Sequence, residues 1–408
     1  METYLVGGAI RDRLLKLPVV EKDWIIVGSE PATLLKLGYK QVGKDFPVFL
    51  HPTTSEEYAL ARVERKISPG YCGFETNFDK TVSLEQDLCR RDLTINAIAE
   101  DKNGKLIDPY HGIQDLKNKI LRHVSSSFIE DPLRVLRLAR FYAKLYHLGF
   151  KVADETYDLM LKMTKNGELN SLVSERVWVE TKKALSQPDP QEYFNLLRAV
   201  DALKILYPEI NNLFGKPQPA KYHPEVDSGI HTMLALKQAC KISDNTKMRF
   251  GVLCHDFGKG TTTDAILPSH YGHEKRGVKI INEFSNRLKI PTQYQKFASS
   301  VAKFHTHCHK ITQLKATTIL KTLNSMRAIG QSDDFKLFLS CCKSDARGRT
   351  KHEKDEYPQA NIFANILEQV LKIDNKKVIA ESGARTNKEI NKVINKAHLK
   401  VIKEVIKT

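Results

Sequence analysis

Cysteine is scarce in this sequence, and its arrangement gives no sign of a disulfide framework. The seven cysteines lie singly apart from the neighbours Cys341 and Cys342, and none belongs to a Cys-x-x-Cys motif. Such use of cysteine is typical of a reduced, cytosolic protein. Long apolar runs are also lacking, so no segment is expected to cross a bilayer, and no signal peptide is expected before the first strand. These absences predict a cytoplasmic protein with no membrane partner.

Acidic residues are outnumbered by basic ones. The 408 residues include 64 lysines and arginines against 48 aspartates and glutamates, a formal net charge of +16. This excess favours a polyanionic partner, with nucleic acid as the first candidate, although an unrelated basic enzyme would show it too. The chain is longer than one typical domain, so about two to four domains are expected.

The most informative stretch, residues 3–28, has the pattern of strand, glycine turn, helix, loop and strand. The apolar run Tyr4–Val6 predicts a strand, a glycine pair ending in Gly8 breaks it, and residues 9–15 then follow a helical period. Glycines that open a helix leave backbone N–H groups at the positive end of the helix dipole, which suits a phosphate. Arg11 lies in the first turn and would add positive charge there.

Two carboxylates, Glu21 and Asp23, precede the second predicted strand, Trp24–Val27. Residues two apart in a strand point to the same face, so these side chains are expected to project together. Two carboxylates on one side are what two magnesium ions need to align an attacking hydroxyl with the α-phosphate of a nucleotide. A charged surface loop would have the same composition, but a phosphate seat and a carboxylate pair within one short unit favour nucleotidyl transfer.

Two later stretches are rich in arginine. The segment LCRRDLTINAIA contains Arg90, Arg91 and Asp92 before an apolar-periodic run. The segment EDPLRVLRLARF begins at Glu130 and predicts a helix with Pro132 in its first turn. Its helical period gives a basic face made of Arg134, Arg137, Arg140 and Lys144. The opposite face is apolar and made of Val135, Leu136, Ala139 and Tyr146. By spacing alone, both stretches would be solvated surfaces.

Taken in order, LVGGAIRD, ExDW, RRDLTINA and EDPLRVLR resemble the motifs of the class II tRNA nucleotidyltransferases. These are the CCA-adding enzymes and poly(A) polymerases of the DNA polymerase β superfamily. The family usually has Asp-x-Asp where this chain has Glu21 and Asp23. The resemblance implies template-independent addition and repair of the 3′-terminal CCA of tRNA from CTP and ATP, with Mg²⁺ held by these two carboxylates. It therefore implies tRNA, ATP and CTP as partners.

The same resemblance implies roles for residues in each motif. Gly8, Arg11 and Arg91 would bind the triphosphate, while Asp92 and Asn96 would order either the loop or the ribose. Asp131 and Arg134 would read the Watson–Crick edge of C or A, which needs no nucleic-acid template. Arg137 and Arg140 would hold phosphates or sugar. A helix beginning at Ser174 would buttress the base-reading helix.

Other parts of the first 125 residues also alternate strands with turns. Residues 46–50 and 57–63 are predicted as strands, and residues 68–79, rich in glycine and polar side chains, as a mobile loop. Relatives in the polymerase β superfamily often place a third carboxylate on a later strand. Glu57 and Glu64 both fit that description, and the sequence does not choose between them.

A second group of motifs lies in the C-terminal half. His231 is followed by His255 and Asp256 in VLCHDFGKG, and Asp345 lies in KSDARGR. This H…HD…D pattern resembles that of the HD-superfamily metal phosphohydrolases, as in bacterial CCA-adding enzymes with an HD domain behind the transferase. The resemblance implies that these four residues hold a transition metal such as Ni²⁺, or Mg²⁺, that activates water against a phosphate. Some of five further histidines would line this site: His270, His273, His305, His307 and His309.

The resemblance implies an α+β protein with five parts. These are a nucleotidyltransferase head (residues 1–125), a helical base-recognition neck (126–190), a helical body and linker (191–225), the HD domain (226–330) and a C-terminal helical region (331–408). The HD domain is expected to hydrolyse 2′,3′-cyclic phosphodiesters, 2′-nucleotides and phosphate esters. The chain is expected to be a monomer or a homodimer.

Two alternative functions stay open at this stage. One is a narrower transferase that adds only A or only CC, since class II enzymes share these motifs. The other is an RNA-binding metal phosphohydrolase whose transferase site is impaired by the glutamate at position 21.

Overall fold

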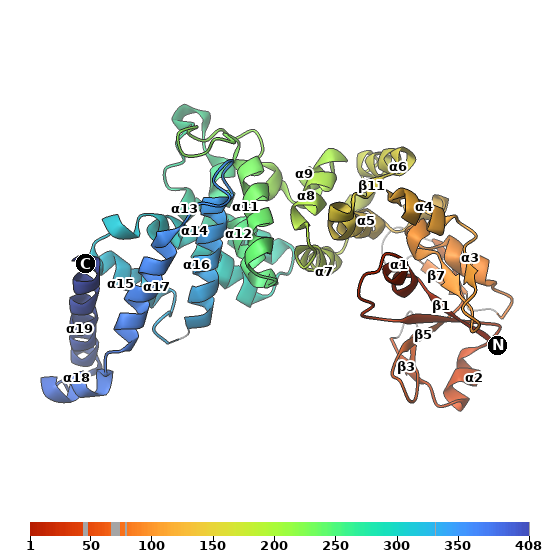
Figure 1. Ribbon diagram of the computed structural model, residues 1–408, viewed down its shortest axis with the longest axis horizontal. Coiled ribbons are helices and arrows are strands. Elements are labelled where there is room, and N and C mark those ends of the chain that lie inside the picture. The colour runs from red at the N-terminus through yellow and green to blue at the C-terminus, as the bar shows by residue number, and fades with distance from the viewer. Residues whose placement is uncertain (44–47, 67–73, 78–79, 331, 408) are drawn as a thin grey trace. The chain divides into compact units, whose positions relative to one another are not determined.

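The computed structural model describes residues 1–43, 48–66, 74–77, 80–330 and 332–407. The chain divides into two compact units, Met1–Leu206 and Tyr207–Thr408. The first combines a sheet with helices, and the described part of the second is built mainly from helices (Figure 1). The predicted α+β fold, with a sheet-containing head followed by helical regions, is confirmed. The five predicted domain boundaries remain predictions.

A seven-stranded sheet forms the centre of the first unit, in the order β3-β4-β5-β2-β1-β8-β9. Strands β2 and β5 are parallel, whereas β1 is antiparallel to both β2 and β8. Val6 at the end of β1 pairs with Asp23 at the start of β2, so the glycine turn lies beside the predicted carboxylates. The strands are β1 (Glu2–Val6), β2 (Asp23–Val27), β3 (Lys40–Val42), β4 (Val48–Leu50), β5 (Glu57–Leu60), β8 (Ala99–Glu100) and β9 (Leu106–Ile107).

Two predictions about this region need correction. The strand expected over residues 57–63 is interrupted after Leu60, and β6 (Val63–Lys66) leaves the main sheet to pair with β7 (Phe74–Asn77). Residues 74–77 were expected to be part of a loop, and the rest of that segment, residues 68–73 and 78–79, lies outside the described residues. Strands β6 and β7 pair through backbone hydrogen bonds. The side-chain pattern of residues 68–79 gave no sign of this pairing. Residues 46 and 47 of the other predicted strand also lie outside the described residues.

Helices complete the first unit. They are α1 (Gly8–Leu14), α2 (Pro31–Lys36), α3 (Leu84–Cys89), α4 (Gly112–Asn118), α5 (Leu133–Leu145), α6 (Asp154–Lys165), α7 (Ser174–Leu185), α8 (Pro190–Ala199) and α9 (Ala202–Leu206), with a small parallel pair formed by β10 (Ile120–Leu121) and β11 (Lys151–Val152). Helix α5 buries Val135, Leu136 and Ala139 completely, as its period predicts. Tyr146, expected on the same face, follows the helix and is 41% exposed, because the helical period no longer applies there.

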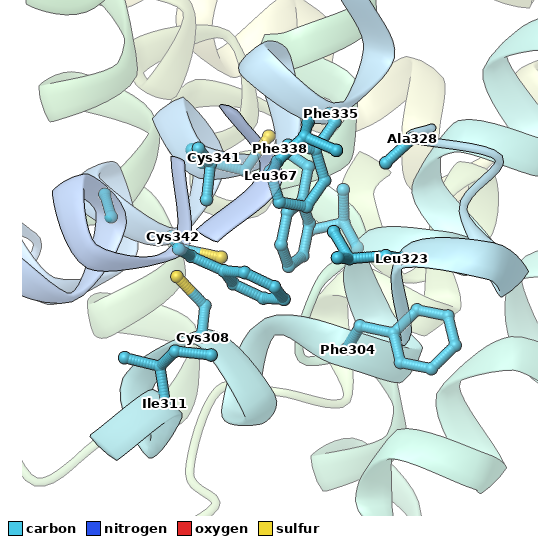
Figure 2. Close-up of a cluster of buried hydrophobic side chains, with 14 of the residues drawn as sticks. Phe304, Cys308, Ile311, Leu323, Ala328, Phe335, Phe338, Cys341, Cys342 and Leu367 are labelled. Atoms are coloured by element: carbon cyan, nitrogen blue, oxygen red, sulfur yellow. The ribbon is translucent and has the colours of Figure 1, made fainter. Parts of the chain in front are cut away.

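The second unit is built from α10 (Pro208–Asn211), α11 (Ser228–Ile242), α12 (Thr246–Cys254), α13 (His273–Arg287), α14 (Thr292–His309), α15 (Ala316–Ser325), α16 (Ser332–Arg347), α17 (Pro358–Leu371), α18 (Asn375–Ser382) and α19 (Asn387–Lys407). Its core is a cluster of aromatic and aliphatic side chains from α11, α12 and α14 to α17. Figure 2 shows Phe335 and Phe338 in this cluster, and Cys308 with its thiol directed toward that of Cys342. All cysteines in the described residues are free thiols, as their spacing predicted.

The C-terminal helix α19 packs one face against this core, with Ile402 fully buried and Leu399 and Val405 in contact with the cluster. Figure 1 shows α19 beside α15 and α17 within this unit. None of the described helices combines the length and apolar character that a membrane span would need.

Candidate functional sites

A cleft of about 910 Å³ opens in the first unit, and arginines dominate its walls. It lies between the turn after β1, the start of β2, the segment after α3 and the helices α5 and α7. It brings together all nine residues predicted for nucleotidyl transfer, which are Gly8, Arg11, Glu21, Asp23, Arg91, Asp131, Arg134, Arg137 and Arg140. Four motifs separated in sequence therefore converge on one cavity.

The two predicted carboxylates line this cleft from different local structures. Asp23 is the first residue of β2, whereas Glu21 belongs to the loop before it, so the pair does not share a strand. The neighbouring cleft wall partly desolvates the carboxyl group of Asp23, although the residue is exposed, and this raises its pKa, a rise that the charge of Arg91 opposes. An anionic pair thus faces a cationic wall, which is the charge pattern that a metal ion and a polyphosphate would complete.

The structure distinguishes the two candidates for a third carboxylate. Glu57 is the direct Cα partner of Asp23 on the neighbouring parallel strand β5. Residues paired in this way point to the same face of a sheet. Glu64 lies on β6 in the separate ribbon, and its side chain falls outside what the structure describes. The register therefore favours Glu57.

The turn after β1 requires glycine at position 7. Gly7 has a φ of 73°, and a Cβ atom built there would lie 2.9 Å from Nη1 of Arg91. Any side chain at this position would be strained and would push Arg91 away. The absence of a side chain therefore allows the turn to pack against the predicted triphosphate-binding arginine, whose Nη1 also donates to the carbonyl of Asn96 at 3.3 Å.

Arg11 is buried and held from several sides. Its Nε donates to Asp12 Oδ1 at 2.8 Å, and its Nη1 donates to Asn96 Oδ1 at 2.6 Å. The guanidinium also lies 4.9 Å from the ring centre of Phe141, and that of Arg140 lies 4.4 Å from the same ring. Phe141 thus positions two predicted ligand-binding arginines through cation–π contacts. The sequence alone gave Phe141 no role in the site.

Asp92 joins the RRD segment to α5. Its Oδ2 accepts a hydrogen bond from Arg137 Nε at 2.8 Å, and its Oδ1 accepts one from Asn96 Nδ2 at 2.9 Å. Burial by itself would raise the pKa of Asp92, but the charge of Arg137 and the hydrogen bond from Asn96 outweigh it and hold the pKa well below its usual value. Of the two roles left open by the sequence, these contacts favour the ordering of the loop.

The two predicted base-reading residues have protein partners in this structure. Asp131 caps the start of α5 and accepts a hydrogen bond from Arg176 Nη2 at 2.9 Å. Arg134 is buried and donates to the carbonyl oxygens of Ser127 and Arg90, each at 2.6 Å. A nucleotide base that used both side chains would have to share or replace these contacts.

Helix α7 supports α5 in the way predicted for the helix beginning at Ser174. Arg176 contacts Asp131, and Glu180, only 3% exposed, accepts a hydrogen bond from Arg140 Nε at 2.6 Å. Arg176 also lines the cleft, so this helix, predicted only to buttress α5, contributes a side chain to the site itself. The sequence signal for Arg176 was its place in the segment SERVW, at the start of the predicted supporting helix.

In the second unit the four residues predicted to hold a metal gather at one place. His231 lies on α11, His255 ends α12, Asp256 follows directly, and Asp345 lies near the end of α16. His231 Nε2 is 3.1 Å from Asp345 Oδ1, and His255 Nε2 is 3.1 Å from Asp256 Oδ2 and 3.8 Å from Asp345 Oδ2. The adjacent His255 and Asp256 can approach each other because α12 ends at Cys254, directly before them.

The ring of His255 is oriented as a metal ligand would be. Its Nδ1–H donates to the carbonyl of Val252 at 2.7 Å, which turns Nε2 toward the carboxylates. Within the described part of the chain this buried Nε2 has no hydrogen-bond partner. Burial by itself would lower the pKa of His255, but the charges of Asp256 and Asp345 outweigh it and raise the pKa to about 9. A divalent ion fits this donor set, because it would satisfy the nitrogen and both carboxylates.

Two residues support this centre from behind, and the sequence did not indicate this role for either. Glu225, in a segment predicted as linker, places Oε1 2.9 Å from His231 Nδ1. His309 Nε2 lies 2.7 Å from Asp345 Oδ2, while its Nδ1 lies 2.7 Å from the hydroxyl of Tyr357. Such partners fix the orientation of metal ligands from behind. The prolines near Glu225 favoured a linker and so gave no indication of this role. His309 was among the histidines expected to line the site.

Family models match three consecutive parts of the chain. The poly(A) polymerase head domain matches residues 3–122, a probable RNA- and SrmB-binding site of polymerase A matches residues 149–214, and the HD domain matches residues 229–328. The first match covers most of the cleft-forming segments, and the third contains His231, His255 and Asp256.

Individual relatives agree with these matches. The multifunctional CCA protein of Mannheimia succiniciproducens is 52% identical over 386 residues, which cover 93% of this chain and 92% of the relative. A solved CCA-adding enzyme in complex with CTP has a TM-score of 0.66 at 19% identity, covering 100% of this chain and 90% of that one. The Thermotoga maritima CCA-adding enzyme complexed with tRNA has a TM-score of 0.64 at 18% identity, covering 99% and 90%.

The fold, the two sites and these matches define a nucleotidyltransferase of the CCA-adding class that carries an HD domain. Within that class, the chain belongs to the family of multifunctional CCA proteins. The resemblance expected from the sequence motifs is thereby confirmed.

Proposed function

We propose that this protein adds and repairs the 3′-terminal CCA of tRNA, using CTP and ATP and no nucleic-acid template. The observation that carries the proposal is the convergence of all nine predicted transferase residues on one cleft. Relatives named multifunctional CCA protein, and solved CCA-adding enzymes bound to CTP, ATP or tRNA, support the choice of substrates. The net charge of +16 suits recognition of tRNA through its phosphates and shape.

In this proposal, Glu21 and Asp23 hold Mg²⁺, and Glu57 is the third carboxylate. Carboxylate oxygens are the donors that Mg²⁺ prefers. When bound, the ions lower the charge of the triphosphate and activate the 3′-hydroxyl of tRNA. The chain itself supplies the guanidinium groups of Arg11 and Arg91, which are fixed by Asn96 and therefore need little reorganisation to receive phosphates.

Nucleotide selection is assigned to α5. Asp131 and Arg134 would offer an acceptor and a donor fork to the base, while Arg137 and Arg140 hold phosphates or sugar. Asp92 and Glu180 anchor these last two arginines, so the helix presents them in fixed positions. The present partner of Asp131, Arg176, would keep this carboxylate oriented until a base takes over the contact.

The HD region is proposed to hydrolyse phosphate esters such as 2′,3′-cyclic phosphates and 2′-nucleotides. His231, His255, Asp256 and Asp345 would hold Ni²⁺ or another divalent ion, which when bound lowers the pKa of a water molecule. Lys259, whose Nζ lies 2.6 Å from Asp256 Oδ2, keeps positive charge beside the centre and would attract the substrate phosphate. A cytoplasmic location and a monomeric or homodimeric state remain part of the proposal.

Incorporation on tRNA ends of defined length tests the transferase proposal against its narrower alternatives. On tRNA lacking all three terminal nucleotides, we expect CTP alone to give two additions and ATP alone to give none. On tRNA lacking only the final A, ATP should give one addition. An A-adding enzyme would fail on the first substrate, and a CC-adding enzyme would fail on the last.

The variant Glu21→Asp tests whether glutamate impairs the transferase site. Because Glu21 lies in a loop and not on the strand, the backbone can accommodate its extra methylene, and we expect incorporation to change by no more than about threefold. Initial rates of CTP addition at saturating Mg²⁺ would measure the effect, with Glu21→Gln as the inactive comparison. A rise of about 100-fold in the aspartate variant would instead support an impaired site.

A further inference from the structure

The last turn of helix α7 forms a part of the cleft wall that has no role in the proposed function. Arg176 lines the cleft from the start of this helix, and Lys183, Ser186 and Gln187 line it from the end. Lys183 follows Arg176 by about two helical turns, so both side chains leave α7 on the same side. Arg176 is occupied by Asp131, which leaves the far end of this stripe unexplained.

Lys183 brings to the cleft a positive charge that no carboxylate neutralises. Its side chain is exposed, and within the described residues its Nζ has no ion-pair partner. Three carboxylates of the cleft are already paired with other cations, in the contacts Asp12–Lys144, Asp92–Arg137 and Asp131–Arg176. The other two, Glu21 and Asp23, are assigned to Mg²⁺. Lys183 can therefore receive a phosphate without first breaking an ion pair.

The backbone that carries Lys183 is fixed at the cleft wall. Its carbonyl oxygen accepts hydrogen bonds from Ser186 Oγ at 2.7 Å and from Gln187 Nε2 at 2.8 Å. These bonds satisfy a carbonyl that the end of α7 would otherwise leave without a partner. A ligand would therefore have to order only the side chain of Lys183, which limits the entropy lost on binding.

The nucleotide does not account for this cation. In the proposed function its triphosphate takes the glycine turn, Arg11 and Arg91, and its base takes the pair next to Arg176. Lys183 belongs to neither group and lies about 10 Å further along α7 than Arg176. The same cleft must also admit a second polyanion, the RNA strand whose 3′-hydroxyl attacks. A lysine ammonium is a compact point charge that suits a single phosphate of such a strand.

We propose that Lys183 binds a phosphodiester in the 3′-terminal segment of the RNA being extended, and so holds that end beside the nucleotide. The inference rests on the proposed transferase function and assigns one end of the cleft to its second substrate. The 3′-terminal base changes with every addition, whereas the phosphate does not. Contact through the phosphate would therefore hold the strand equally well after each step.

Removal of this charge in the full-length protein tests the proposal. For tRNA lacking CCA, Lys183→Gln is expected to raise KM and Kd about tenfold, while KM for CTP stays within about twofold. The slope of log Kd against log salt concentration should become shallower by about 0.7, which is the share of one single-strand phosphate. Lys183→Arg keeps the charge and should restore most of the affinity.

Lys182→Gln is the matched control. Lys182 is exposed in the same last turn of α7 but does not line the cleft, so this variant should keep the wild-type values. Equal losses in the two glutamine variants would overturn the proposal, because general attraction between α7 and RNA would then explain them. Because Lys183 is exposed, thermal unfolding of its variants should match that of the parent protein.

The remaining outcomes separate this inference from the proposed function. A higher KM for CTP with unchanged affinity for tRNA would overturn the inference and move Lys183 to the triphosphate. Unchanged values for both substrates would overturn it as well. A parent protein that binds tRNA in a Lys183-dependent way but incorporates no nucleotide would support the RNA contact and refute CCA addition.

Discussion

The variant Asp23→Asn is expected to incorporate CTP and ATP into tRNA at least about 1,000-fold more slowly than the wild type. The substitution removes the negative charge of a carboxylate that lines the cleft and is assigned to Mg²⁺. A bound metal ion contributes several kcal/mol of transition-state stabilisation. Each 1.4 kcal/mol, roughly, corresponds to a tenfold change in rate. Single-turnover incorporation into tRNA lacking CCA, at saturating nucleotide, would measure the loss at the chemical step.

The control for this variant is Asp158→Asn, which makes the same chemical change at an exposed position on α6 outside the cleft. It should keep the wild-type rate. Asp23→Asn should also keep its thermal stability and its phosphohydrolase activity. Retention of more than about a tenth of the wild-type incorporation by Asp23→Asn would contradict the assignment of this carboxylate.

The second large effect is expected at the HD centre. His255→Ala removes a buried nitrogen that faces two carboxylates, so we expect loss of bound metal and a fall of at least about 100-fold in hydrolysis of a 2′,3′-cyclic nucleotide. Addition of Ni²⁺ to chelated protein should restore hydrolysis in the wild type and not in the variant.

The rate of CCA addition by His255→Ala should stay within about twofold of wild type. The residues that line the transferase cleft all belong to the first unit, whereas His255 belongs to the second. Asp23→Asn and His255→Ala thus form a reciprocal pair, each losing one activity and retaining the other. If His255→Ala hydrolysed the cyclic nucleotide at the wild-type rate, the HD ligand set would be wrong.

Local features of the first unit could be predicted well from sequence. The period of residues 4–28 and its glycine pair were enough to place β1, α1 and β2 within a few residues. What could not be predicted was the environment of each side chain. Helical periodicity put Arg134 on a basic face, but it is buried because the carbonyls of Ser127 and Arg90 accept its hydrogen bonds.

The partners of site residues were the hardest part, because they come from distant segments. The contact of Asp92 with Arg137 joins two motifs, and no spacing rule indicates which arginine of the helix it selects. Glu225 carries no motif at all, yet it orients His231. Conversely, the HD pair itself was found easily, since its function needs two adjacent ligands at a helix end.

The central claim is tested most directly by the product made by the wild-type protein on tRNA that lacks the terminal CCA. Given Mg²⁺ and all four ribonucleoside triphosphates, the reaction is expected to add C, C and A in that order and then stop, as read by sequencing the 3′ ends. Incorporation of G or U, or continued addition of A, would contradict the proposed selection by α5. No incorporation, in a preparation that still hydrolyses a cyclic phosphate, would mean that the HD centre carries the function and that the transferase account is wrong.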